Sequence, residues 1–403
     1  MQIDDRPGVL KIFLIFFMLG ATAFGGPVAH FGYFRIQFVN RLKWIDERAY
    51  ADLVSLCQFL PGPSSSQTAI AIGMMQRGWV GGTAAWLGFT TPALIIMITL
   101  GFGLSFAQTP AGQGVIHGLK LAAVAIIANA LWSMARSACG TATQASFAVL
   151  ACVAMLFATS AWQQILVIAL AALAGALVIR EDSSNIEPPT MRSGSKFLGA
   201  ILFIVFLTLL LGLPLLTQTL SSGNLEAFVS FYRVGSLVFG GGHVVLPMLE
   251  AELVPTGWVS ADTFLAGYGA AQAIPGPMFA LTGYLGNVID PGASYLGGWT
   301  GGLIAIVATF LPSFLLLGAA LAYWDVLRSH ARVRSALSGV NGAVVGLLLA
   351  VFYTPVWTST VQNIVDFATV VIGLLLLSMW KVPPWLFVLL AALSGLLVPL
   401  PGS

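Results

Sequence analysis

A Pro-Gly-Pro motif at Pro61-Gly62-Pro63 lies inside an otherwise apolar stretch, and it constrains the fold more than any other feature of the sequence. Proline lacks a backbone N–H and clashes with the preceding helical turn, and glycine has a low helical preference. A continuous helix across the motif is therefore disfavoured. The motif recurs at Pro275-Gly276-Pro277, and a glutamine precedes each copy at the same spacing, Gln58 and Gln272.

The composition places both helix breaks in a membrane. Of the 403 residues, 58% are hydrophobic and only 8% are charged. Apolar runs such as residues 84–104 and 197–213 approach or reach the length needed to cross a hydrocarbon core of about 30 Å. Lipid offers no hydrogen-bond partner to the backbone, so most of these runs must be helices. We therefore expect an all-α polytopic membrane protein with about 10 to 13 helical segments.

Several classes of function are disfavoured by residues that the sequence lacks. It contains no Gly-x-x-x-x-Gly-Lys-Ser/Thr motif, so no P-loop is present to drive transport with ATP. The three cysteines, Cys57, Cys139 and Cys152, have no metal-ligand spacing, and we expect neither a metal nor a cofactor. The net charge of +2 is too small to indicate a nucleic-acid partner. The acidic residues lie near segment ends or in loops, which disfavours a paired-carboxylate hydrolase site within the membrane.

The two breaks belong to a longer duplication. Phe24-Gly25-Gly26-Pro27 corresponds to Phe239-Gly240-Gly241-Gly242, and Trp44 corresponds to Trp258. The later correspondences that we assign are Gly81-Gly82 with Gly297-Gly298, Pro92 with Pro312, and residues 118–128 with residues 336–346. A fixed order of matched landmarks is the signature of an internal repeat, here of roughly 180 residues.

The basic residues predict that the two repeats are inverted, because loops rich in Lys and Arg stay in the cytoplasm. The loop after the first Gly-Gly motif is basic, whereas its counterpart in the second repeat is acidic. Further along, residues 108–114 contain no basic residue, whereas their counterpart is basic. The charged residues are Arg35, Arg41, Lys43 and Arg48 in the first loop, Glu250, Glu252 and Asp262 in its counterpart, and Arg328, Arg332 and Arg334 in the later segment. Mirror-image charge is typical of repeats with opposite orientations.

This topology makes each Pro-Gly-Pro motif the tip of a re-entrant hairpin. The loop at 35–48 is predicted to lie inside and residues 108–114 outside, so an odd number of crossings separates them. Of the two apolar segments in between, only residues 79–106 are continuous enough to span. Residues 50–76 are therefore expected to enter and leave by the cytoplasmic face, with Arg77 returning to it. The second hairpin is expected to enter from the opposite face.

We divide the chain into three parts. Residues 1–180 form an N-terminal transporter repeat, and residues 225–403 form a C-terminal inverted repeat. Residues 181–224 comprise a polar linker and an extra transmembrane helix at 197–213 that has no counterpart in the first repeat. This helix supplies the additional crossing that inverts the second repeat.

Hydroxyl side chains follow the first tip, at Ser64, Ser65 and Ser66, and Gln67 comes next. Free N–H groups and the positive end of the helix dipole point out of a helix start, so this site suits an oxyanion. The alternative is that Ser64 caps the helix and the other hydroxyls bond their own backbone. No hydroxyl occurs at residues 278–280 after the second tip, so we expect binding to be asymmetric.

Arg233 lies inside an apolar segment before the second glycine motif. An arginine within a membrane is costly unless it faces a polar interior, which makes a substrate contact the leading hypothesis. The alternatives are snorkelling to the surface or a pair with Glu226. Lys120, near a helix start, is a weaker candidate and is expected to be interfacial.

Other polar residues lie close to the breaks. His30 and His243 follow the two glycine motifs and can exchange protons near neutral pH, although a structural role is the alternative. Gln58 and Gln272 can bridge freed backbone groups or line a cavity. Asn129 and Asn341, in apolar helices, are expected to join neighbouring helices. We also expect the glycines of the two breaks to line the substrate site, namely Gly25, Gly26, Gly240 and Gly241.

The motifs resemble the paired signatures of the chromate ion transporter family, in particular its long, two-domain members. They are Phe24 to His30, Gln58-x-x-Pro61-Gly62-Pro63, Phe239 to His243 and Gln272-x-x-Pro275-Gly276-Pro277, and they extend over nearly the whole chain. Family members often carry a basic residue on the helix before the glycine motif. Arg233 fits this pattern, whereas Met18 stands there in the first repeat.

The resemblance implies a multi-pass protein of the bacterial inner membrane that exports chromate, a dianionic analogue of sulfate, with the proton-motive force. Such a protein confers chromate resistance and is not an enzyme. Its partners would be a small oxyanion and membrane lipid, and it would act as a monomer or a homodimer. From the residues alone, the prediction is a secondary transporter with an anion-compatible site. Uptake or exchange of sulfate or another oxyanion and a membrane-embedded lipid-phosphate hydrolase remain as alternatives.

Overall fold

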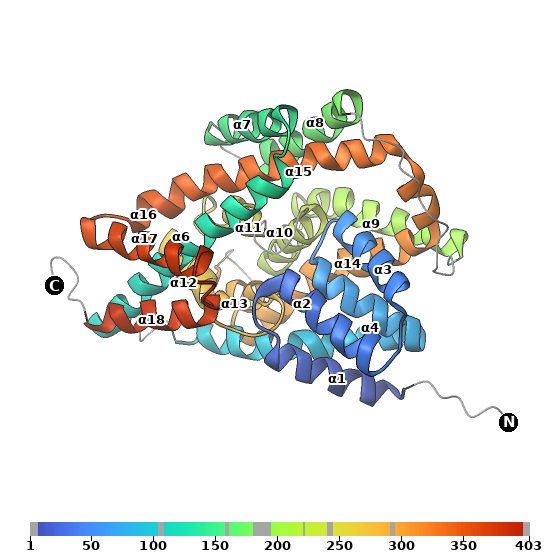
Figure 1. Cartoon of the computed structure of the whole chain (residues 1–403), viewed down its shortest axis with the longest axis horizontal. Coiled ribbons are helices and arrows are strands. Elements are labelled where there is room, and N and C mark those ends of the chain that lie inside the picture. The colour runs from blue at the N-terminus through green and yellow to red at the C-terminus, as the bar shows by residue number, and fades with distance from the viewer. Residues whose placement is uncertain are drawn as a thin grey trace.

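The computed structural model describes residues 7–103, 109–157, 161–179, 195–220, 222–239, 245–290 and 295–397 (Figure 1). These residues form helices joined by turns and contain no strand. Five helices are long and apolar enough to cross a membrane, namely Ser64–Gly101, Gly112–Ala138, Lys196–Thr217, Gly298–Tyr323 and Arg332–Thr360. The predicted fold class, an all-α polytopic membrane protein with inverted repeats and broken helices, is confirmed.

The helices follow the chain in two comparable series. The first is α1 (Val9–Thr22), α2 (Gly26–Phe34), the π-helix η1 (Arg35–Arg41), α3 (Glu47–Phe59), α4 (Ser64–Gly101), α6 (Pro110–Ala138), α7 (Ala142–Leu156) and α8 (Ala161–Val178). The extra helix α9 (Lys196–Thr217) packs against α10 and α14 of the second series. That series is α10 (Gly223–Leu237), α11 (Val245–Leu253), α12 (Ala261–Gln272), η3 (Met278–Ala280), α13 (Leu281–Val288), α14 (Gly298–Ser329), α15 (Ala331–Val351), η4 (Phe352–Trp357), α16 (Thr358–Thr360), α17 (Ile364–Ser378) and α18 (Pro384–Leu397).

The first Pro-Gly-Pro motif is the tip of a helical hairpin between α3 and α4. The backbone of α4 leaves the helical conformation at Arg77 and Gly78, so residues 64–76 form the returning limb and residues 79–101 form a separate span. Gln76 Nε2 donates to the carbonyl oxygen of Trp44, 3.4 Å away, and Trp44 lies just before α3. The ends of the two limbs that lie away from the tip are therefore at the same face, as predicted for a re-entrant hairpin.

The second Pro-Gly-Pro motif joins α12 to η3 and α13 in the same way. At the base of this hairpin, the backbone N–H of Asp290 donates to the carbonyl oxygen of Trp258, 3.1 Å away. Trp258 is the counterpart of Trp44, so equivalent tryptophan carbonyls close the bases of both hairpins.

Close backbone contacts at glycines correct the register that the sequence suggested beyond the hairpins. A Cβ added to Gly73 would clash with the backbone of Gly81, and one added to Gly286 would clash with the backbone of Gly301. Gly81-Gly82 therefore corresponds to Gly301-Gly302. The predicted match with Gly297-Gly298 is wrong because the connection before α14 is longer than the turn inside α4.

A second register correction concerns α6 and α15. Gly118 of α6 packs against the backbone of Ala391, and Gly339 of α15 packs against the backbone of Ala171. Gly118 is thus the counterpart of Gly339, and the predicted match with residue 336 is off by three positions.

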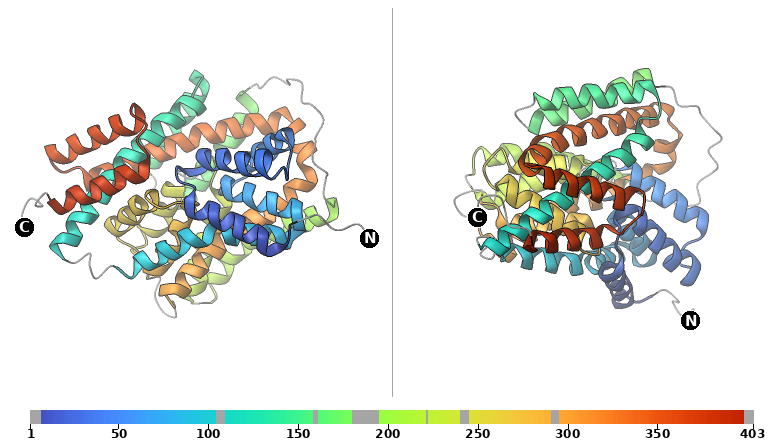
Figure 2. Two further views of the ribbon diagram at one scale, coloured as in Figure 1. Left: turned by 60° about the horizontal axis from the view of Figure 1, so that its bottom comes forward. Right: turned by 60° about the vertical axis from the view of Figure 1, so that its left-hand side comes forward.

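Each repeat also packs its last helices on the other repeat. The helices α17 and α18 lie along α6, whereas α7 and α8 lie along α15. Figure 1 shows α7 and α8 beside α15, and in both views of Figure 2 the red helices α17 and α18 lie beside α6. The two repeats are therefore interleaved, and α6 and α15 occupy equivalent places between them.

Candidate functional site

The two hairpin tips and the two glycine breaks meet in one place. The N–H of Gly62 donates to the carbonyl oxygen of Val238, 2.7 Å away, where α10 ends before the second glycine motif. The N–H of Gly276 donates to the carbonyl oxygen of Ala23, 2.9 Å away, where α1 ends before the first. Each tip is thus bonded to the break of the other repeat. Both tip glycines have positive φ, +119° at Gly62 and +94° at Gly276, a region that favours glycine.

The first glycine break is a sharp change of direction between two helices. Gly25 and Gly26 have φ of +101° and +72°, and they separate α1 from α2. Pro27, next to them, lines the cavity described below. Gly240, Gly241 and His243 of the second break lie outside the described residues.

His30 connects the two tips. It is fully buried on α2, with Nδ1 3.2 Å from the hydroxyl of Ser65 and Nε2 3.2 Å from the carbonyl oxygen of Ala23. A carbonyl oxygen only accepts, so Nε2 carries a proton, and in the neutral ring Nδ1 accepts from Ser65. The Ala23 carbonyl also accepts from Gly276. His30 therefore touches a serine of the first tip and the acceptor that holds the second.

The helix that begins at the first tip has no side-chain cap. Its preceding residue is Pro63, and Ser64 does not act as the cap that the alternative interpretation required. Ser66 Oγ and Gln67 Oε1 are buried and make no hydrogen bond within the described part of the chain. Only Thr68 bonds its own helix, donating to the carbonyl oxygen of Ser64, 2.9 Å away. The first turn thus keeps unused polar groups around an uncapped helix start.

A cavity of about 360 Å³ opens beside this helix start. Its lining comes from the tip, α2, α3, α6 and α15, namely Pro27, Phe31, Gln58, Leu60, Gly62, Ser64, Met134, Ser137, Ala138, Asn341 and Val344. A water molecule occupies about 30 Å³ in the liquid, so a small tetrahedral anion fits together with part of its hydration shell. Asn341, expected to join helices, is exposed and faces this cavity.

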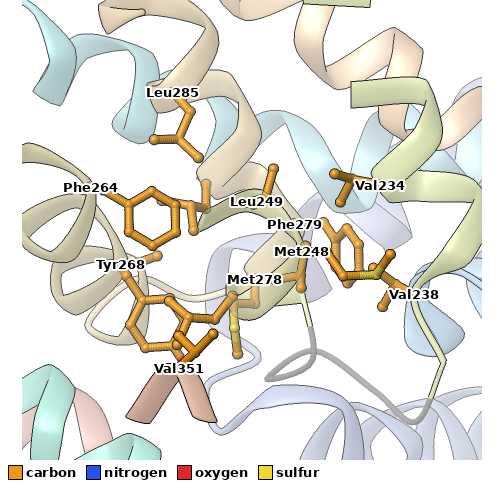
Figure 3. Packing of buried hydrophobic residues seen from close by; sticks show 14 of the residues in the cluster. Val234, Val238, Met248, Leu249, Phe264, Tyr268, Met278, Phe279, Leu285 and Val351 are labelled. Atoms are coloured by element: carbon orange, nitrogen blue, oxygen red, sulfur yellow. The ribbon is translucent and has the colours of Figure 1, made fainter. Parts of the chain in front are cut away.

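The second tip is lined by apolar side chains. Gln272 Nε2 lies 3.4 Å from the sulfur of Met278, a local contact within the hairpin. The side chains around the tip, including those of Ala93, Met97 and Leu281, leave no space of water size. Figure 3 shows Met278 and Phe279 of this tip among the apolar side chains of the core, with Phe279 on the side of Val238.

Ser313 is a polar residue at the first tip that sequence reasoning missed. Gln67 Nε2 donates to the carbonyl oxygen of Pro61 at 2.7 Å and lies 3.5 Å from Ser313 Oγ. Ser313 and its counterpart Ala93 follow the matched prolines of α14 and α4, and each lies against the glycine of a tip. A serine in one copy and an alanine in the other was the signal available in the sequence.

Arg233 lies outside the lining of the cavity. Its Nη1 is 2.9 and 3.3 Å from the two carboxylate oxygens of Glu252, and both side chains are largely buried. This pair joins α10 to α11 across the second glycine motif. The partner expected from sequence was Glu226, so the pair with Glu252 was not predicted.

The family described as "Chromate transporter" matches residues 10–176 and again residues 225–396. The chain belongs to the Chromate transporter family. The resemblance inferred from the four motifs is thereby confirmed.

Individual relatives of this Chromate transporter family member agree with the match. A probable chromate transport protein of Synechococcus elongatus is 27% identical over 389 residues, which cover 95% of this chain and 93% of the relative. A chromate transport protein of Cupriavidus metallidurans is 27% identical over 401 residues, 96% of this chain and 92% of the relative. The uncharacterized transporter YwrA of Bacillus subtilis is 28% identical, and 98% of its length matches 44% of this chain. No solved structure matches the chain.

Proposed function

We propose that this transporter exports chromate across the bacterial inner membrane, driven by the proton-motive force. One relative is named a chromate transport protein and another a probable chromate transport protein, and the match to their family covers both repeats. The sequence has no P-loop, which favours an ion gradient as the energy source over ATP. The observation that carries the proposal is the polar, uncapped helix start at the first tip, which faces a cavity of suitable size.

The anion binds at the start of α4 in this proposal. Ser64 lines the cavity, and the N–H groups of the first helical turn have no acceptor within the helix. These N–H groups and the serine hydroxyls can donate hydrogen bonds, and each oxygen of a tetrahedral dianion can accept them. Gln58 lines the same cavity from α3. Gly25, Gly26, Gly240 and Gly241 complete the set of proposed substrate-site residues. Gln272, which the sequence also placed there, lies at the second tip beside Met278 and is left out of the proposed anion site.

Arg233 enters the proposal through a change of partner. Glu252 holds its guanidinium group in the structure, and a dianion offers the same kind of paired oxygens as this carboxylate. We therefore place the Arg233 contact in a later step of transport than the first encounter at Ser64.

His30 is the proposed site of proton coupling, and His243 is its proposed counterpart in the second repeat. In the neutral ring of His30, Nδ1 accepts from the Ser65 hydroxyl. Protonation of Nδ1 reverses that hydrogen bond and frees the Ser65 hydrogen for another acceptor. The proton on His30 thus decides whether the Ser65 hydroxyl can donate to the anion, which is proposed to bind at the adjacent Ser64.

Flux of labelled chromate from proteoliposomes, with and without an imposed pH gradient, tests this function. We expect protein-dependent flux that the gradient accelerates and that excess sulfate inhibits only weakly. Empty liposomes and a preparation with the gradient collapsed are the controls. Flux equal to that of empty liposomes, or cells that accumulate as much chromate as cells with an empty vector, would contradict chromate export. Efficient flux of sulfate in place of chromate would support the alternative substrate.

A further inference from the structure

Equivalent helices are in contact on one side of the molecule and apart on the other. On one side, α12 packs along α6, where Gly269 meets the backbone of Leu119. The counterparts of these helices are α3 and α15. Between them lies the 360 Å³ cavity, lined by Gln58 of α3 and by Asn341 and Val344 of α15. The two repeats therefore hold the same pair of helices in two different arrangements.

The helices that frame this difference are alike in both repeats. His117 Nε2 of α6 lies 2.7 Å from Asp366 Oδ1 of α17. At the equivalent place on the other side, Gln144 of α7 donates from Nε2 to Ser338 Oγ of α15, 2.8 Å away. Both frame contacts are made, so the framing helices α6 with α17 and α15 with α7 are held alike on the two sides, and the hairpin helices α3 and α12 are placed differently against them.

An ion pair clamps the closed side. Lys120 Nζ lies 2.5 Å from Asp262 Oδ1, in the first turn of α12, and it donates to the carbonyl oxygen of Ser359 at 3.4 Å. The Lys120 side chain is only 8% exposed, so it is buried in the contact and is not the interfacial residue that the sequence predicted. This pair joins a helix of the first repeat to a hairpin of the second.

The positions on the open side that correspond to Lys120 and Asp262 hold residues that cannot form the same ion pair. Lys120 follows Leu119 as Asn341 follows Val340, and Asp262 stands at the same distance before its tip as Arg48 does. An asparagine opposite an arginine makes no ion pair. Asn341 is exposed in the cavity, whereas its counterpart Lys120 is buried. Charge distribution places the clamp on the outer side and the cavity on the side of the cytoplasmic basic loop.

We propose that the two hairpins are the two gates of the transporter, with the outer gate closed by α12 on α6 and the inner gate open between α3 and α15. Inverted repeats can exchange their arrangements, because each repeat can adopt the arrangement of the other. In the opposite state, α3 approaches α15 near Ser55 and Val340, less closely than α12 now approaches α6, because Ser55 carries a Cβ where Gly269 has none. The Lys120–Asp262 pair is then broken. This inference rests on the proposed transport function and adds to it the moving parts and the residues that hold them.

Thiol labelling in membranes tests the proposal without requiring a substrate. In a background with Cys57, Cys139 and Cys152 replaced by alanine, Gln58→Cys reports on the inner cavity through a membrane-impermeant maleimide applied from the cytoplasmic side. We expect Lys120→Ala to lower this labelling rate by about threefold or more, because it releases the outer gate and shifts the population. The exchanged pair Lys120→Asp with Asp262→Lys should restore it.

A second variant approaches the same equilibrium from the other gate. Asn341→Asp places a carboxylate opposite Arg48 in the opposite state, so it should also lower the labelling of Gln58→Cys. Adding Arg48→Ala to Asn341→Asp should restore the labelling. In the Asn341→Asp background, Ser55→Cys and Val340→Cys should form a disulfide on oxidation, because closure of α3 on α15 brings these two side chains toward each other.

Unchanged labelling in both Lys120→Ala and Asn341→Asp would overturn the proposal. It would also be overturned if both double variants failed to restore the labelling. The labelling needs no chromate. If the labelling changes as expected but proteoliposomes show no chromate flux, the proposed substrate is refuted and the proposal of two gates is still supported.

Discussion

Around Gly62, at the first tip, lie Gln67, Ser313 and the start of an uncapped helix that faces a cavity. Around Gly276, at the second tip, lie Ala93 and a shell of apolar side chains with no space for water. The backbones are nevertheless alike, because each glycine has positive φ and donates to the break of the other repeat. Duplication thus supplied the same hairpin twice, and the side chains then made one tip suitable for an anion and the other for packing.

The largest effect is expected where the repeats differ most in charge, at Arg233 in place of Met18. Arg233→Ala leaves Glu252 buried without its guanidinium partner, and breaking such a pair costs about 3–5 kcal/mol. Thermal unfolding in detergent should show a clear loss of stability. The double variant Arg233→Met with Glu252→Leu should recover stability, because an apolar pair replaces the ion pair. A double variant that folds and also transports chromate at the wild-type rate would remove Arg233 from the anion pathway.

The next effect tests the feature that the two tips share. Gly62→Ala and Gly276→Ala each place an alanine at a positive φ, which should lower the free energy of unfolding by about 1–2 kcal/mol. The new Cβ would lie 2.6 Å from Gln67 Nε2 in one case and 2.9 Å from the carbonyl oxygen of Gly20 in the other. Both variants should lose stability and most of their flux. If alanine at one tip leaves unfolding temperature and flux unchanged, the two backbones are not equivalent.

A smaller effect is expected at His30, which links the tips. His30→Ala removes two hydrogen bonds of about 0.5–1.5 kcal/mol each. His30→Gln keeps a donor and an acceptor but does not titrate. We expect both variants to lose the acceleration of chromate flux by a pH gradient, whereas His30→Gln retains exchange of chromate across the membrane. Gradient-driven flux that survives in His30→Gln would move proton coupling to another residue.

The smallest effect is expected at the two glutamines that precede the tips at the same spacing, and it should differ between them. Gln58→Leu removes a polar group from the cavity. The loss of one hydrogen bond weakens binding by about 1 kcal/mol, so the half-saturating chromate concentration should rise several-fold. Gln272→Leu, at the tip that has no space of water size, should leave that concentration unchanged. Equal shifts in concentration-dependent flux would show that the second tip also contacts the anion.

The hairpins and the inversion could be predicted from sequence because their signals are local. Prolines and glycine break a helix wherever it lies, and the basic residues near Arg41 and Arg332 mark the faces. The register beyond the hairpins could not be predicted, since a longer connection before α14 moved the match of Gly81 from Gly297 to Gly301.

The site was predictable only in parts. Ser65 and His30 were each identified, but their contact depends on how α2 packs against the start of α4, and nothing in the local sequence encodes it. Glu252 and Ser313 were missed for the same reason, because each meets its partner through tertiary packing. Asn341 was assigned to a helix interface, since an apolar helix gives no sign that a cavity runs along it.

The central claim is that the anion binds at the first tip and not at the second. Equilibrium binding of labelled chromate to the purified protein tests it most directly, with Ser64→Ala/Ser65→Ala/Ser66→Ala compared against wild type. Ala280→Ser, which adds a hydroxyl at the counterpart of Ser66, is the matched control. Hydrogen bonds to a charged group are worth about 1.5–3 kcal/mol each, so the triple variant should bind at least about tenfold more weakly, with Ala280→Ser unchanged. Wild-type binding by a folded triple variant would contradict the account.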